Sequence, residues 1–346
     1  DGITVAGCEN VVIKDCVLHD IPDSGIMFSN CANSACINNR IDKCSDCGIY
    51  YNTGDGNTGY QNILAFNRIS NIRDGGGIAL KRVSQRTSVV CNSIRDSANG
   101  ITLEQASTAT DYSTDIMINN NRLYYISGAG INLRSSAFCN VSGNRIQIYG
   151  QYGVLIEGLS YANSIVGNVL STDNLFEGTQ FTGGIVLLSR DKNVPQSNTF
   201  CGNVVIGGTH GATAVPALRL ASTETPNAQG ARNIFTGNVF QADQVAVTIA
   251  SYYNDGILMG NTLYSSSASI VQSGDWVIAD NQATPGITAE GRAFISTSPR
   301  QSTWVSDTQP DGALGNVNDI AYASDPSAAV GWVKTSTGWR AFGTLT

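Results

Sequence analysis

Charged side chains and histidines are scarce in this sequence. Lys, Arg, Asp and Glu make up 14% of the 346 residues, against roughly 25% in an average globular domain. The net charge of −7, without a run of basic residues, excludes a nucleic-acid partner, because Lys and Arg are needed to neutralise phosphates. His19 and His210 are the only histidines, so we expect no His-rich metal site and predict no cofactor.

Long apolar runs are also missing. No run approaches the ~20 residues that a membrane-spanning helix needs, so we expect no membrane insertion. The hydrophobic content of 42% is still ample for a core, which excludes a disordered chain. The opening residues, Asp1-Gly2-Ile3-Thr4-Val5, are typical of a strand and not of a signal peptide. We therefore expect the sequence to begin inside a longer protein.

The cysteines do not form an obvious disulfide or metal framework. There are nine, an odd number, so at least one thiol is unpaired. Cys44-Ser45-Asp46-Cys47 has the spacing of a zinc or redox motif, but zinc needs a second pair, and the candidate cysteines lie inside apolar strand patterns instead. We therefore interpret the cysteines as small buried thiols that pack as hydrophobes. Free thiols also favour assembly in a reducing cytoplasm.

A repeat dominates the sequence. An asparagine follows one short apolar run and precedes another, as in Val141-Ser142-Gly143-Asn144-Arg145-Ile146. Because Asn tolerates left-handed backbone angles, we expect it at a turn, where its amide can bond the next coil. The predicted ladder comprises Asp15, Asn39, Asn67, Asn92, Asn121, Asn144, Asn168, Asn203, Asn238, Asn261 and Asn281.

A second ladder of glycines, each followed by Ile or Val, runs in register with the first. It comprises Gly2, Gly25, Gly48, Gly77, Gly100, Gly130, Gly153 and Gly184. We expect these glycines to serve tight turns with positive φ. The intervening apolar runs are short and alternating, as in strands, and one coil cannot bury its own apolar side. The sequence therefore predicts an all-β fold, a right-handed parallel β-helix of about eleven coils over residues 1–286.

The residues in excess of the repeat predict loops and a second domain. Insertions at 53–61, 105–115, 189–197 and 222–232 follow the Gly-Ile strand, and others at 175–182 and 207–214 precede it. Because insertions in a solenoid gather on one face, we expect them to form two walls of a groove. Residues 287–346 hold three of the four Trp and predict a small C-terminal β domain with exposed aromatic side chains, suited to oligomerisation.

Strand alternation assigns the faces of the Gly-Ile strand. The inward pairs are Ile26/Phe28, Ile78/Leu80, Ile101/Leu103, Ile131/Leu133, Val154/Ile156 and Ile185/Leu187. The last outward position on successive coils is then occupied by Asn52, Lys81, Glu104, Arg134 and Glu157, with Tyr50, Thr102 and Asn132 beside them. Adjacent coils lie about 4.8 Å apart, so this stripe alternates in charge along the groove floor.

We interpret the stripe as a carbohydrate site. Glu104 and Glu157 are the predicted catalytic pair, because two coils separate their carboxyl groups by roughly 9–10 Å. That is the upper edge of the separation in inverting glycosidases. Tyr50, Asn52, Lys81 and Arg134 are the predicted substrate-binding residues.

Other interpretations of the stripe remain open. It can be a salt-bridge ladder without further purpose. A lyase would instead use Lys81 or Arg134 to neutralise a uronate and a base such as Tyr50 to remove its α-proton. Carboxylates on the loops compete for the catalytic role, namely Asp74, Asp111, Asp115, Glu177 and Asp191.

The ladders resemble the pectate-lyase-like superfamily, and the C-terminal residues resemble the ending of bacteriophage tailspikes. The residues that carry the second resemblance are Asn318-Asp319-Ile320-Ala321-Tyr322, Gly331-Trp332-Val333-Lys334-Thr335 and Gly338-Trp339-Arg340-Ala341-Phe342-Gly343. Lys334 stands where these endings more often have Cys, and their Gly-Thr-Pro-Gly stretch is missing.

The resemblance implies a homotrimeric, receptor-binding tailspike that cleaves a bacterial capsule or O-antigen polysaccharide. It would be made in the host cytoplasm and act outside the cell as part of the virion tail. Because the family shares its fold more than its catalytic residues, the resemblance assigns no site. The alternatives are a secreted polysaccharide lyase or epimerase and a glycan-binding fibre without activity.

Overall fold

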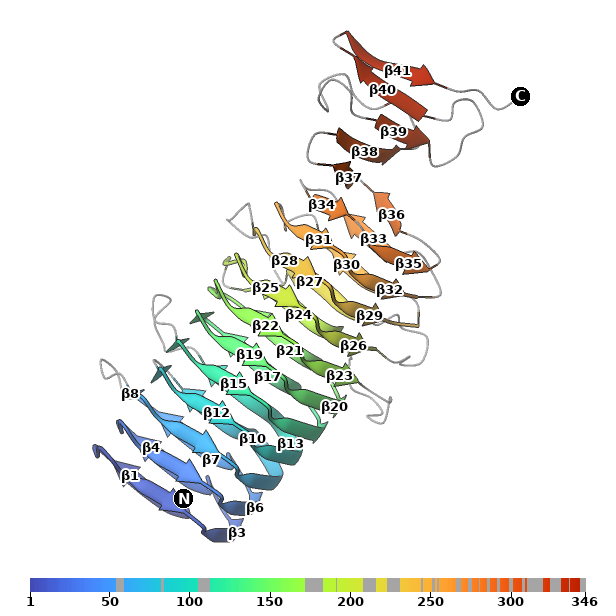
Figure 1. Ribbon diagram of the computed structural model, residues 1–346. Helices are drawn as coiled ribbons and strands as arrows, with labels where there is room; N and C mark the ends of the chain where they lie inside the picture. Colours follow the sequence, from blue (N-terminus) through green and yellow to red (C-terminus); the bar gives the residue numbers. More distant parts are fainter. Residues whose placement is uncertain are drawn as a thin grey trace.

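The protein is a parallel β-helix with a small β region at its C-terminal end (Figure 1). The computed structural model describes residues 1–53, 59–81, 84–104, 113–171, 183–190, 192–207, 216–222, 231–243, 245–250, 253, 255–265, 269–272, 276–279, 281–284, 287–290, 293–298, 301–306, 309, 320–323, 331–335 and 337–342. Most of the predicted groove walls lie outside these residues. Among the described residues, no helix is long and apolar enough to cross a membrane.

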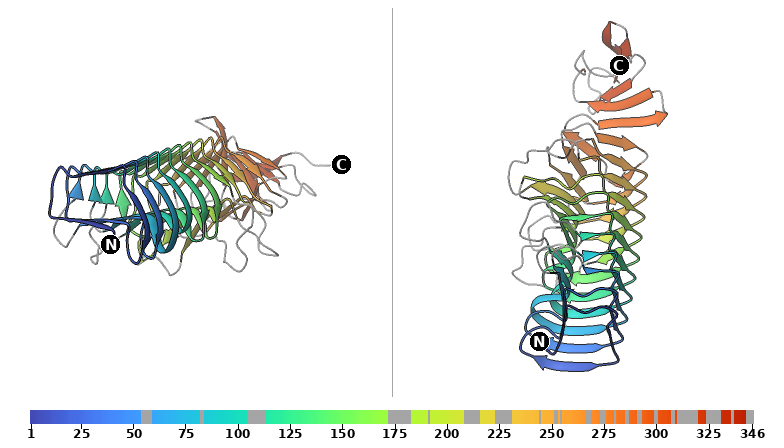
Figure 2. Two further views of the ribbon diagram at one scale, coloured as in Figure 1. Left: turned by 90° about the horizontal axis from the view of Figure 1, so that it is seen from below. Right: turned by 90° about the vertical axis from the view of Figure 1, so that its left-hand side faces the viewer.

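Each coil of the solenoid contributes strands to three parallel sheets, here called face 1, face 2 and face 3 (Figure 2). Face 1 comprises β1 (Ile3–Ala6), β4 (Ile26–Ser29), β7 (Ile49–Asn52), the second part of β10 (Arg68–Lys81), the second part of β13 (Ser93–Glu104), β17 (Ala129–Arg134), β21 (Tyr152–Glu157), β24 (Gly183–Ser189), β27 (Leu218–Ser222), β30 (Val247–Ile249), β33 (Ser269–Gln272) and β36 (Ile287–Glu290).

Face 2 follows face 1 along the chain. It comprises β2 (Val12–Lys14), β5 (Ala35–Ile37), β9 (Ile63–Ala65), β12 (Ser88–Val90), β15 (Met117–Asn119), β19 (Asn140–Ser142), β22 (Ser164–Val166), β25 (Thr199–Cys201), β28 (Ile234–Thr236), β31 (Ile257–Met259) and β34 (Trp276–Ala279). The short strands β8 (Gly59–Tyr60), β11 (Ser84–Gln85), β14 (Ser113–Thr114) and β18 (Ser136–Ala137) form a small sheet between these faces.

Face 3 closes each coil. It comprises β3 (Val17–Ile21), β6 (Arg40–Cys44), the first parts of β10 and β13, β16 (Arg122–Ile126), β20 (Arg145–Tyr149), β23 (Val169–Ser171), β26 (Val204–Ile206), β29 (Val239–Gln241), β32 (Thr262–Tyr264) and β35 (Gln282–Thr284). The strands β10 and β13 run without a break from face 3 into face 1.

The core lies inside the coils. The predicted inward pairs of face 1 are confirmed: each of these side chains is at most 1% exposed. Aromatic side chains stack along the axis in the C-terminal half, where the ring centroids of Phe200 and Phe235 lie 4.5 Å apart. Because the same inward position repeats on every coil, apolar side chains of like shape contact one another from coil to coil and exclude water.

The asparagine ladder forms as predicted, but with one member wrong. Each ladder amide oxygen accepts hydrogen bonds from the neighbouring coil, as where Asn39 donates to Asn67 from its backbone N–H and its Nδ2, both at 3.0 Å. The first coil carries Cys16 at this position, and its N–H donates to Asn39. Asp15 is instead exposed, and its carboxylate accepts a hydrogen bond from the side-chain amide of Asn38.

The backbone reason given for the ladder is also wrong. Wherever the structure describes it, the residue before a ladder asparagine has positive φ, for example 55° at Asn38 and 57° at Asn120. In the later coils glycine takes this place, with φ of 62° at Gly167. The ladder asparagines from Asn39 to Asn261 are buried. Their side chains hydrogen-bond backbone groups that the turn leaves without a backbone partner.

A second buried ladder lies between face 1 and face 2, and sequence reasoning missed it. Asn163 donates to Asn198, and Asn198 donates to Asn233, from Nδ2 at 3.0 Å in both cases. Earlier coils use Ser34 and Asn62 at the same corner, where the N–H of Ser34 donates to the amide oxygen of Asn62. Because the residue type varies along this corner, no single-letter repeat reveals it.

The glycine ladder has a different cause from the one expected. Its members do not have positive φ; instead, they lie where adjacent coils approach closely. A Cβ atom at Gly25 would lie 2.7 Å from the carbonyl oxygen of Gly48, and one at Gly130 would lie 2.6 Å from that of Gly153. Glycine is therefore required here for space and not for backbone conformation.

All nine cysteines are free thiols. The prediction of buried thiols is confirmed for Cys31, Cys36, Cys44, Cys47 and Cys139, whereas Cys8, Cys91 and Cys201 are exposed. Burial raises the pKa of the Cys47 thiol to about 12, so this member of the Cys-x-x-Cys motif stays protonated at neutral pH.

The C-terminal region departs from the parallel pattern. Parallel pairing continues through β36 and into β37 (Ala293–Ser298), and antiparallel pairing begins between β37 and β38 (Gln301–Ser306). The predicted C-terminal β domain contains an antiparallel meander of β39 (Ile320–Ala323), β40 (Gly331–Thr335) and β41 (Gly338–Phe342). The expectation of exposed tryptophans is wrong for Trp332 and Trp339, which are 8% and 3% exposed, because they pack within the single chain.

Candidate active site

The alternating charges predicted on face 1 form one column. Asn52 pairs with Lys81, Lys81 with Glu104, and Arg134 with Glu157. Leu103 pairs with Leu133, so Glu104 and Arg134, the next residues, continue the same column. We call Asn52, Lys81, Glu104, Arg134 and Glu157 the face 1 column.

The N-terminal part of the column is half-exposed. The Lys81 Nζ lies 3.5 Å from the Glu104 Oε2 and 5.9 Å from the centre of the Tyr50 ring. Burial alone would lower the pKa of Lys81, but the nearby Tyr50 and Glu104 outweigh it and raise that pKa. Burial raises the pKa of Tyr50, so this side chain is a neutral phenol at neutral pH. Tyr50 is therefore poorly suited to act as the base of a lyase.

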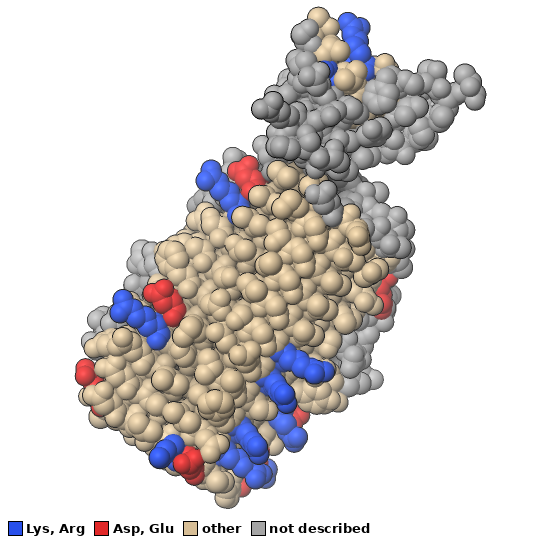
Figure 3. All heavy atoms as spheres, viewed as in Figure 1, with Lys and Arg blue, Asp and Glu red and all other residues tan. Residues whose placement is uncertain are grey.

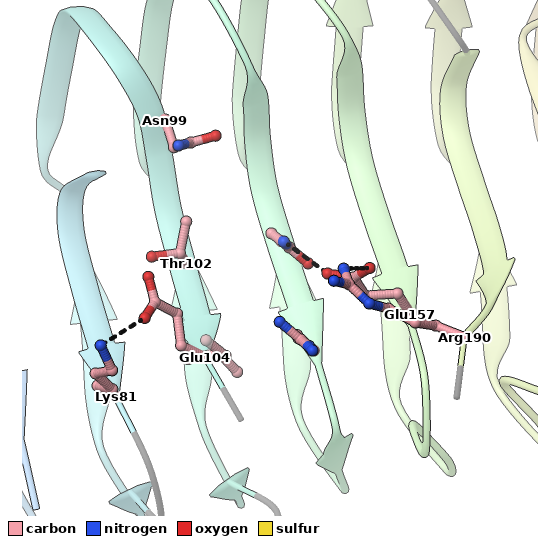
Figure 4. Close-up of a pocket in the computed structure, with 9 residues that line it drawn as sticks. Lys81, Asn99, Thr102, Glu104, Glu157 and Arg190 are labelled. Carbon is pink, nitrogen blue, oxygen red and sulfur yellow. Dashed lines mark hydrogen bonds and ion pairs between the residues drawn. The ribbon is translucent and has the colours of Figure 1, made fainter. Parts of the chain in front are cut away.

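Glu157 has a different environment. Its side chain is only 4% exposed, and its two oxygens accept hydrogen bonds from different residues. Arg190 donates to the Oε2 at 2.9 Å, and Asn132 donates to the Oε1 at 3.2 Å (Figure 4). A guanidinium and an amide placed in this way fix the direction of the carboxylate.

A pocket of about 460 Å³ lies over these strands. It brings together four predicted site residues: Lys81, Glu104, Arg134 and Glu157. Figure 4 shows Glu104 directed toward Lys81, and Arg190 reaching Glu157 from the next strand. The other lining residues are Asn99, Thr102, Leu103, Asn132 and Arg190.

Two polar atoms of this pocket have no hydrogen-bond partner within the described residues. They are the Thr102 Oγ1 and the Asn132 Oδ1, both shielded from solvent. Thr102 is 6% exposed, and Asn132 directs its other amide atom to Glu157. A buried hydroxyl and a buried amide oxygen without partners are costly to the fold.

Two of the predicted binding residues lie beside the pocket rather than in its lining. Tyr50 contacts Lys81 through its ring, and Asn52 precedes Lys81 in the face 1 column. Arg190 was missed by sequence reasoning, because it lies one residue beyond β24 and pairs with Glu157 only through the stacking of coils. The sequence signal that could have identified Arg190 is that it is a basic residue in a chain with few charged residues.

The competing carboxylates do not line this pocket where they are described. Asp74 is exposed and pairs with Arg73, and Asp115 is exposed at the turn before face 2. Asp111, Glu177, Asp191 and His210 lie outside the described residues. Within the described part of the chain, no group of three or more His, Cys, Asp or Glu side chains is arranged to hold a metal ion.

Solved structures with the same fold support the architecture. The mannuronan C-5 epimerase AlgE6 A-module of Azotobacter vinelandii has a TM-score of 0.56 and 11% identity, over 77% of this chain and 80% of that one. The tailspike protein gp49 of Acinetobacter baumannii bacteriophage Fri1, a capsular polysaccharide depolymerase, has a TM-score of 0.57 and 10% identity. That match covers 79% of this chain and 56% of the tailspike chain. At this identity the likeness establishes the fold alone.

Sequence comparison gives the family. No curated protein sequence matches the chain. Residues 1–113 match the family described as a right handed beta helix region, which confirms the predicted hand of the solenoid. Residues 62–256, more than half of the chain, match the family described as periplasmic copper-binding protein (NosD). The chain therefore belongs to the NosD family.

Proposed function

We propose that the protein binds and cleaves an extracellular bacterial polysaccharide in the face 1 pocket. The observation that carries this proposal is the pocket itself: two carboxylates line one polar pocket together with cationic, amide and hydroxyl side chains. Such groups are the hydrogen-bonding partners of sugar hydroxyls. The solved structures of similar fold include a polysaccharide epimerase module and a capsule depolymerase, which supports the same class of substrate.

The two carboxylates have environments that suit different roles. Arg190 and Asn132 hold the Glu157 carboxylate in a fixed direction, which suits a general base that activates water. Glu104 is half-exposed, and its contact with Lys81 at 3.5 Å is loose enough for substrate to displace. Glu104 then acts as the general acid toward the leaving oxygen. Two strand spacings separate the pair by roughly 9–10 Å, which leaves room for the water of an inverting hydrolysis.

A lyase is the second candidate, because the pocket has more basic than acidic side chains. Lys81, Arg134 and Arg190 line it together with Glu104 and Glu157. The additional positive charge suits a uronate carboxylate, whose neutralisation acidifies the adjacent proton. In that reaction Glu157, not the neutral Tyr50, is the better-placed base.

The biological setting follows from the same proposal. We propose a homotrimeric phage tailspike that is made in the host cytoplasm and acts outside the cell as part of the virion. Residues 1–286 carry the glycan site, and residues 287–346 hold the subunits together. The family name indicates the periplasm instead, where a secreted enzyme would act on a polysaccharide of the cell that produces it.

Copper, which the family name mentions, does not fit the described residues. Copper sites in proteins use His, Cys or Met ligands in close groups. His19 is exposed and contacts Asp20, and the described residues assemble no group of three or more ligands. The proposed mechanism therefore assigns copper no part.

The test is cleavage of a panel of capsular and uronate-containing polysaccharides by the whole protein. Size exclusion measures chain length, and absorbance near 232 nm (the band of an unsaturated uronate) separates a lyase from a hydrolase. We expect shortening without new absorbance, and its loss in Glu104→Gln. Asp74→Asn, which neutralises an exposed carboxylate outside the pocket, is the control and keeps full activity. Binding without shortening of any bound glycan would indicate an adhesive fibre and overturn the proposal.

A further inference from the structure

A row of arginines runs along face 3, where no reaction has been assigned. Arg40 pairs with Arg68, Arg68 with Ser93, Ser93 with Arg122, and Arg122 with Arg145. All five side chains occupy the first outward position of their strands and are exposed. We call Arg40, Arg68, Arg122 and Arg145 the arginine row.

The row does not neutralise itself. None of the four guanidinium groups has a carboxylate within ion-pair distance in the described part of the chain. Other basic residues of this face are paired with acidic neighbours: Arg95 with Asp96 at 3.1 Å, and Lys43 with Asp20 at 3.4 Å. Like charges opposite each other on adjacent strands oppose folding, and an external anion would compensate the row more fully than Asp42, the carboxylate whose pKa Arg40 helps to lower.

The row ends abruptly along the solenoid. After Arg145 the same position is taken by Val169, Val204 and Val239. Figure 3 shows Lys and Arg gathered along one border of the N-terminal half of the solenoid, beside a broad surface that carries few charges. The arginines are therefore confined to one stretch, which is the pattern of a local binding surface and not of a general solvating charge.

We propose that the arginine row is a second binding surface, for an acidic polysaccharide, on a different face from the pocket. Coils stack at about 4.8 Å, so the row from β6 to β20 spans roughly 19 Å in single file. An extended polymer with one carboxylate on each sugar presents charges in the same single file. Arginine pairs with carboxylates through two parallel hydrogen bonds, which suits this ligand.

An aromatic side chain adds a contact for the sugar rings. Tyr124 lies in the outward column next to the row, is 41% exposed, and packs edge-to-face on Tyr125 with 4.5 Å between ring centroids. Its apolar face can pack against a pyranose ring while its hydroxyl stays in water. The identity of the polymer as a polysaccharide rests on the proposed function, whereas anion binding by the row does not.

A nucleic acid fits the row less well. A duplex presents two rows of phosphates, and the protein as a whole carries a net charge of −7. The arginine row is one side chain wide, and the column beside it contains Asp42, which accepts hydrogen bonds from Ser70 and Asn71. A duplex backbone would meet this acidic side chain, whereas a single polymer strand avoids it.

A second surface would increase retention of the polymer. Once one stretch of a chain is bound at face 3, another stretch of the same chain reaches the pocket at a high effective concentration. Loss of the row would then weaken binding of long polymers without altering the chemistry on short ones.

The experiment measures binding of fluorescein-labelled oligogalacturonates by fluorescence anisotropy at low ionic strength. The whole protein with Glu104→Gln serves as background, so that cleavage cannot interfere. Each arginine replaced by Ser, the residue already present at position 93, is expected to weaken binding roughly fivefold, as for a charge contact of about 1 kcal/mol. Arg68→Ser with Arg122→Ser should therefore weaken it roughly 25-fold, and Ser93→Arg, which completes the row, should strengthen it roughly fivefold.

Matched controls separate binding from folding. Arg73→Ser removes an arginine of β10 that is already paired with Asp74, and it should leave binding unchanged. The row variants should not lower the thermal unfolding midpoint, because they remove like-charge repulsion. Neutral dextran oligosaccharides and single-stranded oligo-dT of similar length are the competing ligands.

Four results would overturn the proposal. They are equal binding of dextran, tighter binding of oligo-dT, an affinity unchanged in the double Ser variant, and no binding of oligogalacturonate. These results differ from those expected if the proposed function is wrong. In that case the wild-type protein cleaves no glycan, while oligogalacturonate binding and its dependence on the arginine row persist.

Discussion

Two charged columns on one solenoid follow opposite rules. The face 1 column alternates Lys81, Glu104, Arg134 and Glu157, whereas the arginine row on face 3 repeats one sign. Both lie on parallel strands of the same coils, with the same spacing between neighbours. Backbone geometry therefore cannot explain the difference between them.

The difference shows what each column needs from outside. Alternating charges compensate one another, and the buried Glu157 finds its partner in Arg190 within the chain. The arginine row leaves its charges to the solvent or to a ligand. A column whose charges are compensated within the chain holds its side chains in fixed positions, which suits catalysis. A column whose positive charges are not compensated attracts an anionic polymer. The following changes test this distinction.

The largest expected effect is on catalysis. Glu104→Gln removes the proposed proton donor and should lower kcat by about 10²- to 10⁴-fold, as for other general acids. Arg68→Ser should leave kcat on short oligosaccharides unchanged, because the row lies on another face. Turnover measured by reducing ends checks both variants. Equal losses in the two would mean that the columns are not functionally separate.

The next effect is on stability. Arg190→Ala leaves the buried Glu157 carboxylate with Asn132 alone, and breaking a buried pair costs about 3–5 kcal/mol. Because Arg190 is 42% exposed, we expect a smaller loss, about 2 kcal/mol of unfolding free energy. Arg145→Ala on face 3 should cost less than about 0.5 kcal/mol. Urea unfolding of the two variants gives the comparison, and similar losses would refute it.

Reversing a sign should exchange the behaviour of the columns. Arg68→Glu places a carboxylate opposite Arg40, with Ser93 on its other side, and should stabilise the fold by a few tenths to about 1 kcal/mol, while polymer binding falls. Glu104→Arg on face 1 should destabilise it by a similar amount, since three basic residues then follow one another. Thermal melts at low and high salt measure this, and the difference should shrink as salt screens it.

The smallest expected effect is that of pH on polymer binding by the arginine row. Arginine stays charged throughout, so binding should be constant from about pH 7 to pH 9. Above pH 9 the fold itself weakens. Burial raises the pKa of Cys36 and Cys47 from 9.0 to about 12, so the folded state keeps protons that the unfolded state releases. Stability is complete below pH 9 and falls as pH rises toward 12; a loss of binding below pH 9 would implicate other groups.

The sequence was sufficient for the repeat but not for the reasons behind it. Spacing and alternation predicted the strands, the inward pairs and the face 1 column, because these depend on local periodicity. The role of Gly25 and the place of Cys16 in the ladder depend on how closely adjacent coils approach, which spacing alone does not contain. The buried Trp332 and Trp339 likewise depend on packing in the C-terminal region.

Within the site, residues from neighbouring coils were harder to predict than those on one repeat position. Arg190 belongs to the turn after β24, so no register argument assigned it to Glu157. The arginine row was present as Asn-Arg pairs in the repeat, yet each arginine is separated from the next by a full coil. A chain without a run of basic residues can therefore still bring basic side chains together when it folds. The lack of such a run in the sequence does not by itself exclude a polyanionic ligand.

The asparagine ladder also makes the solenoid a modular object. Every link between its asparagines is the same, with the side-chain amide of one coil donating to the oxygen of the next, as from Asn121 to Asn144 and from Asn144 to Asn168. A coil copied or removed as one unit would rejoin the ladder with all its donors and acceptors matched. Gene duplication of a single coil could thus lengthen the arginine row by one charge, and the reach of the protein along its polymer could evolve in steps of one coil.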